Sequence, residues 1–330
     1  MAGRFAPSPT GSLHAGSLLA AVGSYLDARS AGVRWIVRIE DLDAARVIPG
    51  CADEMLRTLE AYGFEWDGEV VLQSARREAY REALDSLARS HRTFECSCSR
   101  KDLAGGPGGA NGDDAAAYPG TCRGGPAKAG ATARRFRVSD GSLRFNDLFL
   151  GSQTFDLGLL GDFVVERRDG VASYQLAVVV DDAWQGVTRV IRGADLLAST
   201  PWQMELQDSL GLPRPIYGHL PLLVEPDGSK LSKSRRSIPI PVPAWVPVPD
   251  RRNQIAGRSD PTAISLALTS TLTYLSQRPP AELARAPINE VWAWALAHWR
   301  PQALVGRKQV ELSAASDREA EISSANCGTL

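Results

Sequence analysis

Apolar and polar positions alternate along the chain with periods that predict an ordered succession of helices and strands. Leu18, Leu19, Val22, Tyr25 and Leu26 recur at spacings near three and four, which predicts an amphipathic helix. The nearly continuous apolar run 35–39 predicts a buried strand that ends at the acidic sequence 40–43. Later segments continue the pattern, with helices over 52–62, 76–89 and 199–210, a strand over 187–193 and an apolar segment over 216–223. Such alternation is typical of a nucleotide-binding α/β domain.

The middle of the chain interrupts this alternation. Residues 104–131 are rich in Gly, Ala and Pro. Three segments that follow are typical of short strands: 134–138, 143–150 and 163–167. The apolar run 176–180 predicts another strand, ending at Asp181 and Asp182, which either line a site or cap a helix. We interpret this part as an insertion into the α/β domain and not as a second independent domain.

The last third begins with a proline-rich segment. Five prolines between residues 239 and 249 exclude a helix or a central strand there and favour an extended path. Helical patterns return over 261–276 and 287–298. The polar stretch from Gln302 onward is expected to fray at its tip.

Composition and charge narrow the class of protein. The 330 residues are 44% hydrophobic and 23% charged, which is ordinary for a globular protein and excludes collagen-like, disordered or coiled-coil chains. A net charge of −1 gives no sign of nucleic-acid binding, although an average hides local patches. No apolar run is long enough for a membrane span, and the N-terminus does not resemble a secretory signal. Five cysteines are too few for a disulfide scaffold, so we expect a reducing, cytoplasmic location.

Two segments carry candidate chemistry for phosphate binding. Residues 7–17 form a glycine-bearing turn that brings His14 and Gly16 to a helix N-terminus, where backbone N–H groups favour an anion. The alternative is an ordinary strand–turn–helix corner with a surface histidine. Residues 228–234 contain Lys230 and Lys233 among hydroxyl side chains, which suits the charge of a triphosphate. The alternative there is a solvated basic loop.

Together, in this order, the two segments resemble the H-x-G-x and K-x-S-K-S motifs of class I aminoacyl-tRNA synthetases. They are His14-Ala15-Gly16-Ser17 and Lys230-Leu231-Ser232-Lys233-Ser234. Residues 4–11, 37–43 and 191–195 are similar to the glutamyl branch of that class. The resemblance implies an α/β fold: a Rossmann-type catalytic domain, an inserted zinc-bearing α+β subdomain and a short helical C-terminal region.

The length after the second motif points to one group within this branch. Only 96 residues follow Ser234, whereas a full glutamyl-tRNA synthetase carries a large helical anticodon-binding region there. The chain resembles the shortened paralogues, the glutamyl-queuosine tRNA(Asp) synthetases, over residues 3–234 and again over 272–299; residues 235–270 and the tail after 300 depart from their pattern. The expected division is 1–90 and 181–236 for the two halves of the catalytic domain, 91–180 for the insertion and 237–330 for the Pro-rich and helical C-terminal region, without an anticodon-binding domain.

The cysteines form a third candidate site. Cys96, Cys98 and Cys122 have a spacing that allows a shared metal, but reduced, unligated cysteines in a loop are the alternative. The family resemblance implies a structural zinc ion bound by these three thiolates and by the Tyr118 oxygen, with His91 as a substitute ligand. The stretch 105–114 is longer than the loop usual in the family. Cys51 and Cys327 lie outside the constellation.

The resemblance also implies a reaction and its residues. The glutamate carboxylate attacks the α-phosphate of ATP, which is bound together with Mg²⁺, and pyrophosphate leaves. The implied catalytic residues are His14 and Lys233. The implied ATP-binding residues are His14, Gly16, Ser17, Lys230, Ser232 and Lys233. The implied glutamate-binding residues are Arg4, Phe5, Ala6, Pro7, Ser8, Glu40, Tyr174 and Arg192. Arg4, Glu40 and Arg192 lie at strand ends, where parallel sheets bind ligands; surface ion pairs and core packing are the alternatives.

The implied acceptor is queuosine in the anticodon loop of tRNA(Asp). For the oligomeric state, a monomer is the default expectation. Two arginine pairs, 235–236 and 251–252, are candidates for phosphate contacts. One alternative is a short enzyme that charges the tRNA 3′ end. Another is a non-catalytic RNA-binding paralogue stabilised by zinc.

Overall fold

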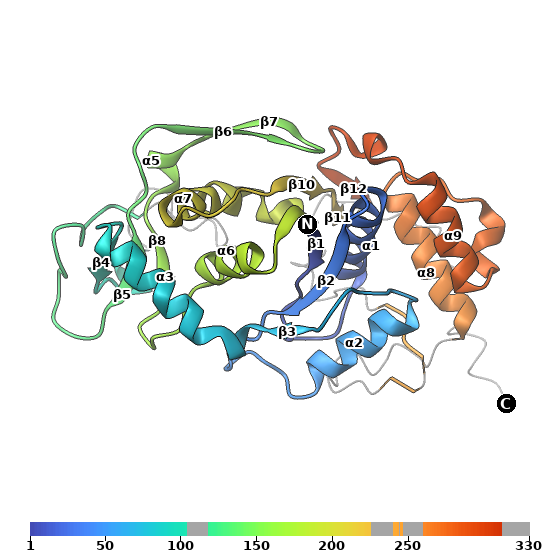
Figure 1. Cartoon of the computed structure of the whole chain (residues 1–330), viewed down its shortest axis with the longest axis horizontal. Coiled ribbons are helices and arrows are strands. Elements are labelled where there is room, and N and C mark those ends of the chain that lie inside the picture. The colour runs from blue at the N-terminus through green and yellow to red at the C-terminus, as the bar shows by residue number, and fades with distance from the viewer. Residues whose placement is uncertain (104–117, 226–239, 244, 247–259, 312–330) are drawn as a thin grey trace.

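The computed structural model describes residues 1–103, 118–225, 240–243, 245–246 and 260–311. Its centre is a five-stranded parallel sheet (Figure 1). In spatial order the strands are β10 (Ile216–Leu220), β9 (Val187–Gly193), β1 (Ala2–Phe5), β2 (Arg34–Ile39) and β3 (Val71–Leu72). The strand order reverses between β1 and β9. Ligands of such sheets bind beyond the carboxyl ends of the strands at this reversal.

Helices cover both faces of the sheet, so each central strand has apolar side chains on both faces. Trp35 and Val37 of β2 belong to one core, and Ile36 between them belongs to the other, as the two-residue period of a strand requires. The first core is completed by α1 (Ala15–Ser30), α2 (Cys51–Ala61), α8 (Pro261–Tyr274) and α9 (Ile288–His298). The second is completed by α3 (Arg77–Arg89), α6 (Tyr174–Trp184) and α7 (Thr200–Leu210).

The C-terminal helices pack directly on the first core, against α1 and the residues that follow α2. The Trp292 ring of α9 lies 4.8 Å from the Tyr25 ring and 5.0 Å from the Phe64 ring, between centroids. Its Nε1 donates a hydrogen bond to the Tyr62 carbonyl oxygen at 2.7 Å. In Figure 1 these helices lie beside α1, at the opposite end of the molecule from the start of the insertion. The short helical C-terminal region is therefore confirmed as part of the same folded unit.

The insertion forms its own small sheets. An antiparallel sheet contains β4 (Thr93–Cys96), β5 (Ala133–Phe136) and β8 (Phe163–Glu166), and a hairpin contains β6 (Ser142–Asp147) and β7 (Gly151–Asp156). Two short helices, α4 (Arg100–Leu103) and α5 (Leu157–Leu160), complete it. The turn of the hairpin is tied to the catalytic domain, because Leu148 N donates to the Tyr217 carbonyl of β10 at 2.8 Å. A further parallel pair joins β11 (Leu222–Val224) to β12 (Gln309–Glu311).

Two predictions of local structure were wrong. The run 176–180 is the middle of helix α6, so Asp181 and Asp182 lie within a helix and do not end a strand. A short, wholly apolar run has no periodicity that separates a buried strand from a buried helix. The single strand expected over 143–150 ends at Asp147, and the chain turns back as β7. The expected insertion boundary at residue 180 falls inside α6.

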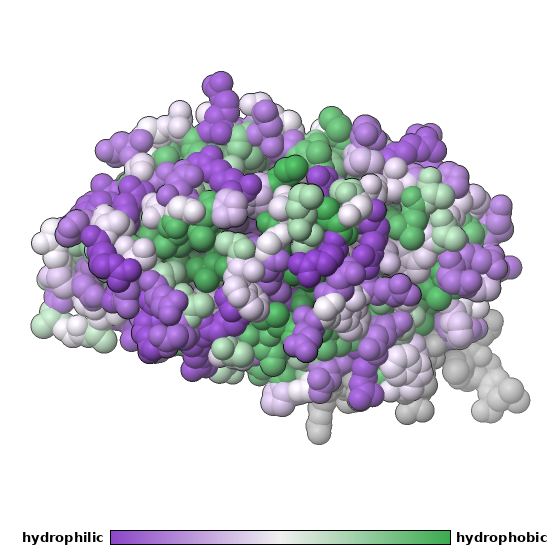
Figure 2. Space-filling model, viewed as in Figure 1, coloured by the Kyte–Doolittle hydropathy of each residue, from purple (hydrophilic) through white to green (hydrophobic). Residues whose placement is uncertain are grey.

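The remaining predicted elements are confirmed to within a few residues in the described part of the chain. The described residues of the proline-rich segment, 240–243 and 245–246, belong to neither a helix nor a strand; among them Ile240, Val242 and Val246 are buried. No helix among the described residues is long and apolar enough to cross a membrane. Figure 2 shows hydrophilic residues over much of the visible face, with smaller apolar areas between them.

Candidate functional site

His14 caps the N-terminus of α1 with its side chain. It has extended backbone angles, and its Nδ1 accepts hydrogen bonds from Gly16 N at 3.1 Å and Ser17 N at 3.3 Å. A Cβ on residue 16 would approach the imidazole to 3.1 Å, so glycine lets the ring lie flat against the backbone. With Nδ1 accepting, the proton of the neutral ring is on Nε2. The half-buried histidine thus shapes the helix start, which disagrees with the alternative of an ordinary surface histidine.

This cap requires neutral His14. Burial lowers the pKa of His14 from its ordinary 6.5, and the Asp195 charge opposes that effect only in part. Because the folded-state pKa is depressed, the contribution of the cap is complete above about 6.5 and is lost as the pH falls below that value. We expect wild-type protein to lose about 0.5–2 kcal/mol more unfolding free energy between pH 7.5 and 5 than His14→Asn, which caps without titrating. Urea unfolding at the two pH values measures this, and identical losses would contradict it.

Beside the carboxyl ends of β1 and β2 lies a buried cluster of arginines and aspartates. Asp182 Oδ1 lies 3.4 Å from Arg4 Nε and 2.8 Å from Arg38 Nη2. Asp181 Oδ1 pairs with Arg76 Nε at 2.6 Å. Burial raises the pKa of Asp182, but Arg4 and Arg38 outweigh it and hold that pKa below its usual range. Both arginines are therefore held by carboxylates from α6, far away in the sequence.

Glu40 follows β2 and adds a carboxylate to the same region. Its Oε1 lies 3.4 Å from Arg38 Nη2, and its backbone N donates to the Pro7 carbonyl at 2.9 Å, which joins the loop after β1 to the end of β2. Burial raises the pKa of Glu40, and Arg38 and Arg4 oppose the shift. The Glu40 carboxylate therefore shares Arg38 and Arg4 with Asp182. An additional cation would stabilise its ionised form.

Tyr174, the first residue of α6, lies among the charged residues predicted for the glutamate pocket. Burial raises the pKa of its hydroxyl. The charges that also act on this hydroxyl belong to Arg192, Glu40, Arg4 and Asp182. The charges of two predicted cations and one predicted anion thus act together on one phenol near the reversal of the sheet. The alternative in which Arg192 and Glu40 form surface ion pairs is inconsistent with this burial.

Arg192 of β9 differs from Arg4 in its partners. Its Nε donates to His219 Nε2 at 3.2 Å, and its Nη2 donates to Thr200 Oγ1 at 2.8 Å and to the Leu196 carbonyl at 3.3 Å. Its Nη1 is buried with no hydrogen-bond partner in the described part of the molecule. A buried, unpartnered guanidinium nitrogen is costly unless a ligand accepts from it. Arg192 therefore has an unused donor suited to a carboxylate.

The other predicted residues contribute unequally. The Phe5 ring is buried and stacks on Trp35, with centroids 6.4 Å apart, so Phe5 can face a ligand only with its backbone. Ala6 and Pro7 are half-buried, and Ser8 is exposed. Lys230, Ser232 and Lys233 lie outside the described residues, as do the arginine pairs 235–236 and 251–252.

Several polar residues of the site were not predicted. Arg38 could have been recognised as a charge inside an apolar strand, whereas for Asp181 and Asp182 the sequence left open whether they line the site or cap a helix. His219 and Asp147, whose Nδ1 and Oδ2 lie 2.5 Å apart, come from distant elements and show no common pattern in the sequence.

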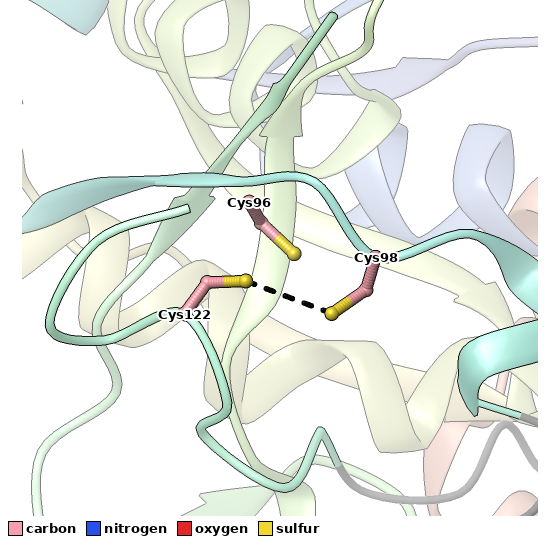
Figure 3. Close-up of side chains that lie close together, drawn as sticks. All are labelled: Cys96, Cys98 and Cys122. Carbon is pink, nitrogen blue, oxygen red and sulfur yellow. Dashed lines mark hydrogen bonds between the residues drawn. The ribbon is translucent and has the colours of Figure 1, made fainter. Parts of the chain in front are cut away.

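The cysteines of the insertion converge, as Figure 3 shows. The sulfur atoms of Cys96, Cys98 and Cys122 lie within 4.8 Å of one another, with Cys98 and Cys122 at 3.6 Å. Tetrahedral thiolates on one zinc ion have sulfur atoms about 3.8 Å apart, given a Zn–S distance of about 2.3 Å. These three residues could hold a metal ion. Among the described residues the cluster does not include His91, which lies exposed in the turn before β4.

Tyr118 occupies the fourth side of the cysteine cluster. Its hydroxyl oxygen lies 3.4 Å from Cys96 Sγ and 3.8 Å from Cys98 Sγ, and accepts from Cys122 N at 2.8 Å. The Arg135 guanidinium stacks 4.0 Å above the Tyr118 ring and donates to Cys96 Sγ at 3.3 Å. A nearby cation favours the thiolate form, which is the form that binds metals. Three sulfur atoms and one oxygen therefore face one another, and the donor set suits a metal ion.

Comparison with known proteins identifies related sequences. The family described as tRNA synthetases class I (E and Q), catalytic domain, matches residues 1–242. A protein of Pseudomonas aeruginosa PAO1 named Glutamyl-Q tRNA(Asp) synthetase is 50% identical over 298 residues, which cover 90% of this chain and 92% of the relative. A protein of the same name from Dechloromonas aromatica is 51% identical over 299 residues, covering 90% and 93% of the two chains.

Solved structures share the fold. A glutamate tRNA ligase from Elizabethkingia meningosepticum, crystallised in complex with its amino acid, has a TM-score of 0.72 at 22% identity. The match covers 97% of this chain and 68% of that one. The glutamate-tRNA synthetase of Elizabethkingia anophelis has a TM-score of 0.73 at 23% identity, with coverage of 97% and 69%. The expected class I catalytic fold is thereby confirmed.

Proposed function

The chain belongs to the class I tRNA synthetases of the E and Q type, and on that premise we propose that it activates L-glutamate with ATP and transfers the glutamyl group to queuosine in tRNA(Asp). The observation that carries the proposal is the placement of Arg4, Glu40 and Arg192 at the carboxyl ends of the adjacent strands β1, β2 and β9, with Arg192 Nη1 unpartnered among the described residues. Glutamate presents two carboxylates and one ammonium group. Two arginines and one carboxylate match those three charges.

Activation joins the glutamate carboxylate to the α-phosphate of ATP and releases pyrophosphate. The reaction needs no covalent enzyme intermediate, so the residues act by positioning and electrostatic stabilisation. His14 holds phosphate oxygens through its Nε2–H, and the N-terminus of α1 with Gly16 and Ser17 adds backbone donors. Lys230, Ser232 and Lys233 complete the ATP site, with Lys233 countering the charge on the leaving pyrophosphate. Mg²⁺ accompanies ATP and neutralises part of the phosphate charge.

Arg4 and Arg192 bind the two carboxylates of glutamate, and Glu40 accepts from its ammonium group. The charges of Arg4, Arg192 and Glu40 all act on the Tyr174 hydroxyl, which we assign to the same pocket. The segment Phe5–Ser8 lines the pocket between β1 and α1, with the Ser8 hydroxyl as a further donor.

The proposed acceptor is the cyclopentenediol of queuosine in the anticodon loop. Relatives named Glutamyl-Q tRNA(Asp) synthetase support it, since they match 90% of this chain at about 50% identity. The protein acts as a monomer in the cytoplasm. Its catalytic domain comprises residues 1–90 and 181–236, interrupted by the insertion 91–180 and followed by the C-terminal region 237–330. Charging of the tRNA 3′ end is the second candidate, because the structures that share the fold are glutamate tRNA ligases.

The metal of the cysteine cluster is one structural zinc ion, bound by Cys96, Cys98, Cys122 and Tyr118. Zinc favours tetrahedral sets rich in thiolates. We expect about one zinc per wild-type chain and a lower melting temperature after chelation, since a ligand at about 1,000 times its Kd stabilises by about 4 kcal/mol. Cys98→Ser should lose the zinc, whereas Cys51→Ser, at a cysteine outside the cluster, should keep it. The zinc content of wild-type protein, Cys98→Ser and Cys51→Ser is measured by inductively coupled plasma mass spectrometry. The same zinc content per chain in all three would overturn this assignment.

Two assays test the proposed function. Glutamate-dependent exchange of labelled pyrophosphate into ATP tests activation. Transfer of labelled glutamate to bulk tRNA with and without queuosine tests the acceptor. The proposal predicts exchange, and label only on the queuosine-containing pool, recovered in the anticodon-loop fragment after ribonuclease digestion. Label on both pools that is recovered on the terminal adenosine would instead establish 3′ charging, and absence of both exchange and transfer would exclude a catalyst.

A further inference from the structure

A chain of buried polar groups links the insertion to Arg192. Asp147, at the end of β6, contacts His219 of β10 through Oδ2 and Nδ1, 2.5 Å apart. His219 Nε2 lies 3.2 Å from Arg192 Nε and 3.2 Å from Thr200 Oγ1. The side chains of Asp147 and His219 are fully buried. A single side chain, that of His219, thus separates Asp147 from Arg192, whose Nη1 has no hydrogen-bond partner among the described residues.

The hydrogen bonds define which nitrogen of His219 carries the proton. Arg192 Nε–H can only donate, so His219 Nε2 must accept. The proton of the neutral ring is then on Nδ1, where Asp147 accepts it. Asp147 Oδ1 accepts three backbone N–H groups, from Phe149 at 3.0 Å, Leu150 at 2.9 Å and His219 at 3.1 Å, so its carboxylate cannot easily rotate. The anchored carboxylate selects the tautomer.

The pKa shifts of His219 and Asp147 agree with a neutral imidazole protonated on Nδ1. Burial lowers the pKa of His219, with Asp147 opposing the shift and Arg192 reinforcing it. Burial raises the pKa of Asp147, but the contacts with His219 and the backbone N–H groups outweigh it and lower that pKa. At neutral pH the imidazole is therefore neutral and the carboxylate ionised.

We propose that Asp147 and His219 are positioning residues that orient Arg192 so that its Nη1 faces the glutamate carboxylate. This inference rests on the proposed function. Arg4 and Arg38 contact Asp182 directly, which compensates their charge. Arg192 is instead held by a neutral imidazole, a hydroxyl and a carbonyl. Neutral acceptors fix the guanidinium without an adjacent counter-ion, so its charge remains available to a substrate carboxylate.

Asp147→Asn is the most direct test, because it changes the tautomer without removing bulk. The amide oxygen must accept the three backbone N–H groups, so the amide N–H₂ faces His219 Nδ1 and donates to it. The imidazole proton then moves to Nε2, where it faces Arg192 Nε–H. We expect the KM for glutamate in pyrophosphate exchange to rise about tenfold or more, as loss of a hydrogen bond to a charged group implies, with the KM for ATP within about twofold of wild type.

Three further variants separate positioning from general destabilisation. Asp27→Asn is the matched control, since buried Asp27 pairs with Arg189 of the same strand β9 at 2.6 and 2.8 Å; its glutamate KM should stay at the wild-type value. His219→Gln retains an acceptor near Nε2 and should preserve much of the glutamate affinity. His219→Asn has no acceptor within reach of Arg192 and should raise KM. Equal KM values for the last two, or an unchanged KM in Asp147→Asn, would overturn the proposal.

The tautomer itself gives a readout that is independent of activity. The chain has four histidines, so nitrogen-15 NMR can assign His219 by comparison with the His219→Gln spectrum. We expect an Nδ1 proton in wild-type protein and an Nε2 proton in Asp147→Asn. The same tautomer in both would refute the positioning role. Wild-type protein that shows the expected tautomer but no glutamate-dependent exchange would overturn the proposed function instead.

Discussion

Arg192→Gln will lower kcat/KM for glutamate in pyrophosphate exchange by about 10²- to 10³-fold. Removing one partner of a buried, hydrogen-bonded charge pair costs about 2–5 kcal/mol, and Arg192 Nη1 has no hydrogen-bond partner among the described residues. Most of the loss should be in the KM for glutamate, because the guanidinium is already held in place before the ligand arrives. The KM for ATP should change little.

The control for this experiment is Arg189→Gln on the same strand. Arg189 also forms an ion pair, with the buried Asp27, but it is half-buried and lies at the opposite end of β9 from the proposed glutamate site. It should lose stability without losing affinity for glutamate. Arg192→Gln with a wild-type glutamate KM would contradict the proposed pocket.

Asp182→Asn will lower the free energy of unfolding by about 3–5 kcal/mol. The substitution leaves the buried guanidinium groups of Arg4 and Arg38 without the carboxylate between them, and an uncompensated buried charge costs about that much. Because the folded-state pKa of Asp182 is depressed, its contribution is complete above the ordinary 3.8 and disappears as the pH falls through the lowered value. The loss should therefore be fully visible in urea unfolding at neutral pH.

An exposed pair provides the comparison. Asp169 contacts Arg167 at 2.7 Å, with about half of its side chain exposed, and Asp169→Asn should change stability by less than about 1 kcal/mol. If Asp182→Asn were as stable as Asp169→Asn, the buried cluster would not support the fold as described.

The site could be predicted from the sequence where a chemical residue ends a recognisable strand. Arg4, Glu40 and Arg192 all do so, and the parallel sheet brings strand ends together. Asp182 was harder, because the apolar run before it has the same pattern as a buried strand and is a helix. Its role depends on the tertiary packing of α6 against the sheet, which periodicity does not record.

The positioning residues Asp147 and His219 could not be predicted from the sequence for the same reason. His219 is one polar residue in an otherwise apolar strand, and Asp147 is in a hairpin of the insertion. Only the packing of that hairpin on β10 makes them neighbours. The cysteines are an intermediate case. Their spacing alone slightly favoured a loop of reduced thiols, and the fold around β4 resolves the geometry by bringing Cys122 to 3.6 Å from Cys98.

The most direct test of the account identifies the nucleoside that carries the glutamate. Purified tRNA(Asp) containing queuosine is incubated with the protein, ATP and isotope-labelled glutamate. The tRNA is then digested to nucleosides, which are separated by liquid chromatography and identified by mass spectrometry. The account predicts the label on queuosine, and none on the terminal adenosine. Label on the terminal adenosine, with queuosine unchanged, would contradict it and make the protein a tRNA-charging enzyme.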